Sequence, residues 1–540
     1  MEDNTEVKAK ESFFSKCSNY IIHKLKDRYF LKGISTLIGA SLINFLAGSI
    51  FSLCQLVIYE ISYIYHFNRK SKISTVKEAF YYPVEVFFQC LASIFSGLLY
   101  KMVGLHYTNL LGVGILCLGY LIIFLSNSFT FDMFGMIFGG IGTGIIYYPS
   151  TANACEWFMD NNGIVIGIIE TMISLGSFFF NLIGEKVINP KQERSEEKSK
   201  LYSPEIGKNF KTFTLYLLLF SIILYILSSL LMFTKRKNKS NEININLLLD
   251  DSENENENKK EKESDEVKKD ENEEINQLDF IKRNIHIKNV YIELKNMVNK
   301  AMKSKKFIIF LFIAVLESPV PSMIFALYRE MGETEKIQQL FLISIGPINF
   351  IFECVGGFAF GVLCDYVKKQ YLLLFILGFN ALTSFIYCIT FKNDITFFLA
   401  TNFVSFTSGG FYSVKDCFII GVFGVEIYVE LIALVNFSVA LIIIGLTPLA
   451  SILDDKKKQT GYWTIFSILG ILTLIGFALC FYVKEDTYTF DRIIDYEDEN
   501  NDNDNDNDNE KEKDKDKDKE NDDKKDSSNE EKKDEEKTMN

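Results

Sequence analysis

The side chains best suited to chemistry in this sequence are ionisable residues inside long apolar stretches. Glu317 and Glu353 stand deepest, the sequence leaves the depth of Glu85 and Glu170 open, and Lys415 lies toward the cytoplasmic end of its stretch. An ionised group at the centre of a bilayer costs at least ~2.5 kcal/mol, so such residues are functional candidates. A buried carboxyl group can also exchange protons near neutral pH. We therefore expect these side chains to bind a solute or to carry a proton.

Two of these candidates also have a structural interpretation. Glu353 can be a protonated acid that is hydrogen-bonded between helices, and Lys415 can extend its ammonium group toward the membrane surface. Other chemistry finds no support in the sequence. The four histidines avoid the span centres, and neither a C-x-x-C pair nor a G-x-x-x-x-G-K-[ST] loop occurs. We expect no metal site, no cofactor, no nucleophile with its base, and hence no enzyme.

The elements that must position these residues are membrane-spanning helices. A bilayer core ~30 Å thick requires ~20 apolar residues per helix. The apolar segments cover residues 33–57, 79–100, 106–126, 131–154, 163–184, 211–233, 307–328, 338–364, 371–391, 395–419, 427–450 and 462–482. This pattern predicts an all-α polytopic membrane protein with twelve transmembrane helices in two six-helix halves, surrounded by membrane lipid.

Polar segments flank and separate these halves. The predicted organisation is a cytoplasmic N-terminal segment (1–32), a first half (33–234), a disordered central loop (235–306), a second half (307–483) and a disordered acidic low-complexity tail (484–540). The tail holds 25 acidic and 12 basic residues and so accounts for the whole net charge of −13. The remainder is neutral and offers no basic face for nucleic acid.

Basic residues predict the orientation. Clusters at 16–32, 235–239 and 300–306 flank the spans on the side of the termini and the central loop, and a cluster at 69–77 lies on the opposite side. Since positive flanks stay cytoplasmic, the three clusters favour cytoplasmic termini. The sequence leaves open whether the membrane is the plasma membrane or that of an organelle.

Two loops at matching places in the halves resemble a known signature. GLLYKMVG (97–104) follows the second span, and GVLCDYVKK (361–369) follows the eighth. The second loop resembles the major facilitator superfamily signature G-x-x-x-D-[RK]-x-G-x-[RK]-[RK]. Its matching residues are Gly361, Asp365, Lys368 and Lys369. The resemblance implies the twelve-helix fold and a gate in which the carboxylate meets a helix N-terminus in one state only. The first loop has Lys101 in place of the acid, so the sequence does not decide whether this loop forms a latch.

A second stretch, GGIGTGIIYYPSTANACEWFMDNNGIVIGI (139–168), resembles the oxalate/formate antiporter and monocarboxylate porter branch of that family. The matching features are a glycine-rich helix, Tyr147 or Tyr148, and the Trp-Phe pair at 157–158. Gly140 and Gly144 form a small-x-x-x-small face that lets helices approach and move, so we assign them to gating. The branch implies a carboxylate cargo held by basic residues in spans eight, one or eleven. Those spans lack them here, which favours a cationic, zwitterionic or neutral solute.

Polar side chains at helical spacing indicate which faces meet the cargo. Asn44 belongs to a stripe at 41, 44, 48, 52 and 55, and Tyr412 to one at 402, 405, 409, 412 and 416. We expect a monomeric secondary transporter that moves a small organic solute, a monocarboxylate or amino-acid-like compound, by alternating access with a proton as the co-transported ion. The alternatives are a transport-inactive sensor on the same scaffold and a carrier of cationic or neutral solutes.

Overall fold

The computed structural model describes residues 28–67, 80–191, 193, 202–235, 291–292, 294–456 and 460–483. Within these ranges every element is helical. Residues 1–27, most of the central loop and the tail from residue 484 lie outside the described residues, so their predicted disorder stays a prediction.

The first half consists of six long helices. They are α2 (Arg28–Phe67), α4 (Tyr81–Val103), α5 (Leu105–Leu125), α6 (Phe129–Trp157), α7 (Asn162–Ile188) and α8 (Pro204–Leu231). A short 3-10 helix, η1 (Met159–Asn161), joins α6 to α7. Gly104 connects α4 to α5 at a φ of +84°, a conformation that favours glycine.

The second half contains seven helices that form six spans. They are α11 (Lys305–Glu317), α12 (Pro319–Thr334), α13 (Gln339–Tyr366), α14 (Lys369–Thr390), α15 (Asp394–Phe423), α16 (Tyr428–Lys456) and α17 (Thr460–Cys480). Eleven described segments are long and apolar enough to cross a membrane, with α11 and the start of α12 counted together. The polar α15, at 30 residues, is long enough to be the twelfth.

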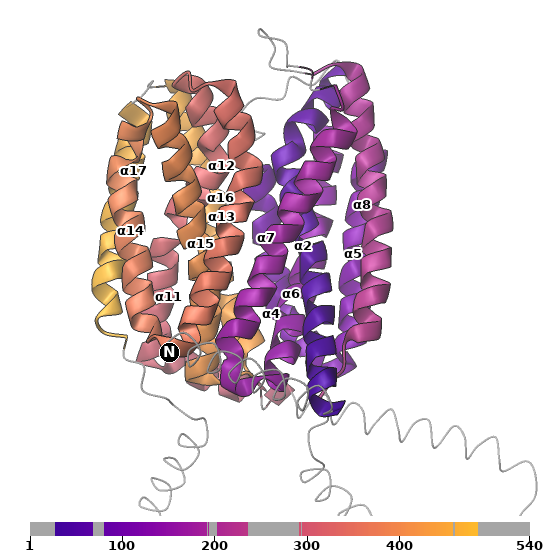
Figure 1. The fold of residues 1–540 in the computed structure, drawn as a ribbon, viewed down its shortest axis with the longest axis vertical. Helices are drawn as coiled ribbons and strands as arrows, with labels where there is room; N and C mark the ends of the chain where they lie inside the picture. Colours follow the sequence, from indigo (N-terminus) through magenta and orange to yellow (C-terminus); the bar gives the residue numbers. More distant parts are fainter. Residues whose placement is uncertain are drawn as a thin grey trace, which may run out of the picture. The chain divides into compact units, whose positions relative to one another are not determined.

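Residues 1–420 and 425–485 form one compact unit, and the other unit comprises 421–424 and 486–540, of which only 421–424 are described. Within the first unit, the indigo-to-magenta helices of the first half gather in one group and the orange-to-yellow helices of the second half in another (Figure 1). Contacts of α7 with α13 and of α4 with α16 join these groups.

Glycines let the helix backbones touch. A Cβ atom on Gly144 would overlap the backbone oxygen of Gln89, and one on Gly140 would overlap that of Glu85, so α6 lies directly against α4. Gly361 of α13 meets Gly167 of α7 in the same manner. Because lipid provides little hydrophobic drive for helix pairing, such close contact supplies van der Waals energy instead.

The seventh span is broken in its middle. Ser318 separates α11 from α12, and Pro319 begins the second piece. Proline lacks an N–H donor and collides with the preceding turn, which ends α11 at Glu317. The hydroxyl of Ser318 donates to the Ala314 carbonyl at 2.8 Å and occupies one acceptor of the last turn. The break lies beside the cavity described next.

Candidate functional site

A cavity of about 140 Å³, lined by both polar and apolar side chains, lies where the two halves meet. A single water needs ~10–15 Å³ by the same measure, so a solute of amino-acid size fits. Eight helices supply its walls: α2, α4, α6 and α7 from the first half, and α12, α13, α15 and α16 from the second. Five predicted site residues line it: Tyr147, Glu170, Glu353, Tyr412 and Lys415.

The acidic wall of the cavity comes from α7 and α13. The hydroxyl of Tyr147 donates a hydrogen bond to Oε1 of Glu170, a residue that is 6% exposed. Glu353 faces the cavity from α13 and is half-buried. The two carboxyl groups therefore belong to opposite halves and border one space.

The basic wall is formed by Lys415 of α15. Its Nζ donates to Oδ1 of Asn436 at 2.7 Å and lies 4.8 Å from the ring centroid of Tyr412. Nδ2 of Asn436 in turn donates to the hydroxyl of Tyr148. Lys415 is 4% exposed and forms no ion pair within 4.0 Å among the described residues. The ammonium group thus points into the bundle and does not extend to the membrane surface.

Three other predicted residues lie outside the cavity lining. Glu317 accepts from Nδ2 of Asn380 at 2.7 Å, within the second half. Asn44 donates to the Ala40 carbonyl of its own helix at 2.8 Å. Glu85 is fully buried in α4, and neither of its carboxylate oxygens has a hydrogen-bond partner in the described part of the chain. Their roles in binding or proton coupling stay predictions.

Sequence reasoning missed two polar residues that line the cavity, Asn436 beside Lys415 and Gln89 on α4. Asn436 stands alone in an apolar stretch of α16 and its partner Tyr148 is 288 positions earlier. No local spacing signals such a pair. Gln89 belongs to a polar stripe at 85, 89, 93 and 96 of the second predicted span, but nothing in that stripe distinguishes it from helix-packing residues.

The acidic latch, which we define as Asp365 with the N-terminus of α7, joins the halves at one end. Oδ1 and Oδ2 of Asp365 accept from the backbone N–H groups of Gly163 and Ile164, each at 2.9 Å. An N-terminal turn presents free N–H groups and a partial positive charge, which suit a carboxylate. Of the basic residues of the same motif, Lys368 is exposed and Lys369 begins α14, and their gating roles stay predictions.

The lysine latch, which we define as Lys101 with Glu430 and the Glu426 carbonyl, joins the halves through α4 and α16. Lys101 Nζ lies 3.1 Å from Oε1 of Glu430 and donates to the Glu426 carbonyl at 2.7 Å. The first-half loop therefore makes an ion pair of the opposite polarity to that of Asp365, with the acid on the first turn of the partner helix. Both latches lie at the same end of the bundle. One pocket is lined by Met159, which directly precedes α7 of the acidic latch, and by Glu426 of the lysine latch.

Reversing one charge of the lysine latch should weaken it. We expect Lys101→Glu to place two carboxylates together and to lower the transport rate about fivefold, which corresponds to ~1 kcal/mol for a partly exposed pair. The double variant Lys101→Glu, Glu430→Lys should recover more than half of the loss in proteoliposome uptake. Lys392→Glu, at an exposed turn, is the matched control. Equal defects in the single and double variants would show that the pair does not act as a latch.

Two groups of six spans that meet around a polar cavity, with latches at one end, define the class of two-half membrane transporters. Comparison with protein families agrees: the Major Facilitator Superfamily model matches residues 40–414. The chain belongs to this superfamily, whose members transport solutes by alternating access. Its fold resembles the crystal structure of FucP, a transporter of this superfamily in the outward conformation, with a TM-score of 0.55 and 11% identity over 84% of this chain and 100% of that chain.

The comparison with curated proteins found no match. At 11% identity, the likeness to FucP shows the fold alone. Neither comparison supports the oxalate/formate and monocarboxylate branch that residues 139–168 resemble. The substrate must therefore be argued from the cavity itself.

Proposed function

We propose that this protein is a secondary transporter for a small amino-acid-like solute, one that carries both a carboxylate and an amino group. The cavity between the halves is the proposed binding site. The end that holds the two latches is proposed to face the cytoplasm, in line with the positive flanks of the spans. The proposed working unit is a monomer, since one chain supplies both halves of the site.

The observation that carries this proposal is that Lys415 is buried and has no carboxylate partner among the described residues. An ammonium group removed from water and left without a carboxylate partner is costly. Here its described partners are the neutral Asn436 and the ring of Tyr412. A solute carboxylate entering the cavity would supply the missing anion and would find a fixed cation ready to receive it.

The acidic wall supports an amino group on the same solute. Glu170 and Glu353 border the cavity that Lys415 also borders. A simple monocarboxylate would satisfy Lys415 and leave both glutamates without a cation. A zwitterion satisfies both walls at once, and the tyrosines between them add aromatic faces for the ammonium group.

Alternating access follows from the placement of the latches. Both latches join a helix of one half to a helix of the other, so the latched end opens only when both are broken. The broken span contributes Ser318, Pro321 and Ser322 to the cavity wall. Discontinuous helices of this kind commonly border transporter sites and can bend as the halves rock.

Glu353 is the proposed proton carrier. Glu353→Gln keeps the shape of the side chain and most hydrogen bonds but cannot titrate. We expect accumulation driven by a proton gradient to fall at least tenfold, while exchange of labelled for unlabelled solute persists. Both are measured in proteoliposomes with an imposed pH difference. Wild-type accumulation with wild-type pH dependence would make Glu353 structural and would move the proton-coupling role to Glu317, the deepest remaining predicted acid.

The substrate class is tested with matched compounds. The full-length protein in proteoliposomes is given one labelled amino acid at a time, together with its deaminated acid or its decarboxylated amine as competitor. We expect uptake of amino acids and weak competition by either analogue. Competition by the acid alone would support the monocarboxylate alternative, competition by the amine alone a cationic cargo, and either result would overturn the zwitterion.

A further inference from the structure

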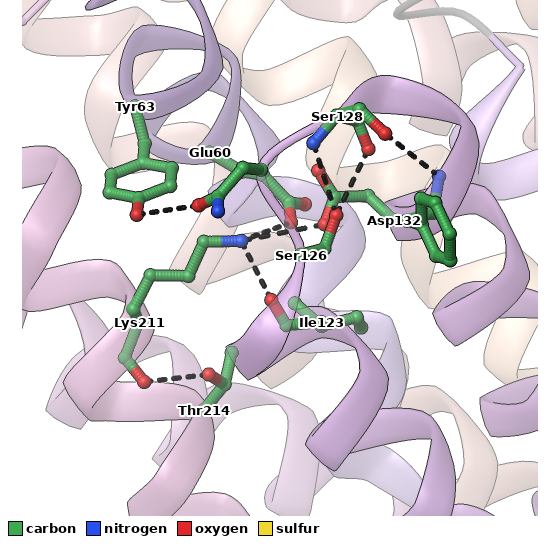
Figure 2. A network of polar contacts seen from close by, with 10 residues as sticks. Glu60, Tyr63, Ile123, Ser126, Ser128, Asp132, Lys211 and Thr214 are labelled. Carbon is green, nitrogen blue, oxygen red and sulfur yellow. Dashed lines mark hydrogen bonds and ion pairs between the residues drawn. The ribbon is translucent and has the colours of Figure 1, made fainter. Parts of the chain in front are cut away.

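A second group of buried charges lies inside the first half, away from the transport cavity. Lys211 of α8 reaches between Glu60 of α2 and Asp132 of α6 (Figure 2). Its Nζ lies 3.5 Å from Oε1 of Glu60 and 3.4 Å from Oδ1 of Asp132. None of these residues lines the cavity. They are 2%, 0% and 6% exposed in the order Glu60, Asp132, Lys211.

The contacts of Lys211 match those of an ammonium group. An ammonium group has three N–H donors, and Nζ has three oxygen acceptors: Glu60, Asp132 and the Ile123 carbonyl at 2.7 Å. The ring centroid of Tyr63 lies 4.9 Å from Nζ, a distance at which an aromatic face attracts a cation. Lys211 is therefore an ammonium group whose donors are all used.

If both acids were ionised, Glu60 and Asp132 together would carry one more negative charge than Lys211 neutralises. Oδ2 of Asp132 is buried and has no hydrogen-bond partner among the described residues. Lys211 has no further donor to offer it. Two carboxylates that share one cation out of reach of water carry a net charge of −1, and carboxyl groups so placed do not both ionise.

We propose that Glu60, Asp132 and Lys211 form a proton-binding site in which the two carboxyl groups share one proton. With that proton the group is neutral: one ammonium, one carboxylate and one carboxylic acid. The second carboxylate oxygen of Asp132 is buried without a hydrogen-bond partner among the described residues, and we assign it as an acceptor for the shared proton. The site is separate from the proton-carrying role proposed for Glu353 and does not depend on it.

The surroundings contain few other groups that titrate. Tyr63 on α2 donates its hydroxyl proton to Oδ1 of Asn127 at 2.8 Å, and Cys54 lies earlier on the same helix. The α5 helix contributes the Ile123 carbonyl, and its one histidine, His106, lies at its far end. The first turn of α6 adds a partial positive charge near Asp132, which makes this acid the better carboxylate and Glu60 the better proton holder.

The position of the proposed proton-binding site means that loss of its proton would affect helices that also wall the cavity. Glu60 lies near the C-terminal end of α2, whereas Tyr29 at its N-terminal end packs against Trp157, close to the latches. Loss of the proton would leave one net negative charge among α2, α6 and α8. Since α2 and α6 also wall the cavity, the site can report pH at the unlatched end to the helices that bind the solute.

Infrared difference spectroscopy of the purified full-length protein tests the proposal. A carboxylic acid absorbs at a C=O frequency that a carboxylate lacks, and the background from other buried acids cancels between variants. We expect Glu60→Gln and Asp132→Asn each to lose one carboxylic acid absorption relative to wild type at neutral pH, because the remaining acid ionises against Lys211. Lys211→Met should gain one, since both acids then stay protonated.

Glu205→Gln is the matched control, because Glu205 is exposed at the first turn of the same helix as Lys211. Its spectrum should match wild type in the carboxylic acid region. If neither Glu60→Gln nor Asp132→Asn changes that region, both carboxyl groups are ionised and the shared proton does not exist. Using both isosteric variants keeps the test decisive when one of them is poorly folded.

Discussion

Replacing Lys415 by methionine should abolish uptake of an amino-acid-like solute while leaving the protein folded. Methionine retains the length of the side chain and removes the one cation found in the cavity lining. Truncating one partner of a buried charge pair costs 2–5 kcal/mol, which corresponds to a loss of affinity of roughly 30- to 5,000-fold. Initial uptake rates over a range of solute concentrations measure this loss as a rise in KM.

Lys392→Met, at an exposed turn, controls for the loss of a positive charge as such. Removal of the solute carboxylate offers an independent check. If Lys415 binds that group, the variant should no longer distinguish an amino acid from its decarboxylated amine. A variant with unchanged KM and unchanged selectivity would contradict the role given to Lys415 and with it the zwitterionic cargo.

Gly144→Leu should stop transport by forcing α6 away from α4. A Cβ atom at this position would overlap the Gln89 carbonyl oxygen and lie 3.2 Å from Cβ of Ala92. Because the contact is with backbone, no side-chain movement relieves it, and overpacking typically costs 1–3 kcal/mol or more. Gln89 lines the cavity, so the displacement also distorts the site. We expect uptake below a tenth of wild type with normal membrane expression.

Gly114→Leu provides the matched control. Gly114 is exposed on α5, and a Cβ atom there meets nothing within 4 Å. This variant should transport like wild type. Normal uptake by Gly144→Leu would show that α4 and α6 separate without harm, and the glycine face would then have no part in gating.

The sequence allowed the helices to be predicted well because lipid imposes one rule on every span. A run of about 20 apolar residues suffices. The break at Ser318 was not predicted, because the seventh span was predicted as continuous over 307–328, although Pro319 explains it. Helix ends were less accurate for a physical reason. Polar residues extend several helices beyond the apolar core, so that α8 begins at Pro204 and not near residue 211.

The misplaced start of α8 explains why the buried cation Lys211 was not predicted. The sixth span was predicted to begin at residue 211, and Lys415 was named as an interior cation while Lys211 was not. The structure buries Lys211 between Glu60 and Asp132. Its partners are 151 and 79 positions away, and no local pattern records such distances.

The lysine latch was hidden for a similar reason. Lys101 departs from the family signature, and only its place beside Glu430, far along the chain, shows that the polarity of the pair is reversed. The acidic latch was predictable in kind because Asp365 keeps the signature. Its partner was not, since the N–H groups of Gly163 and Ile164 belong to backbone whose position depends on the packing of α7 against α13.

Counterflow tests the central claim of alternating access most directly. Proteoliposomes that contain the full-length protein are loaded with an unlabelled amino acid and diluted into a trace of the same labelled compound. A carrier that exposes one site to each side in turn will draw label inward above its equilibrium level before the gradient decays. We expect this transient overshoot, and we expect Lys415→Met to lack it. Label that rises only to equilibrium, or does not enter for any amino acid supplied, would contradict the account.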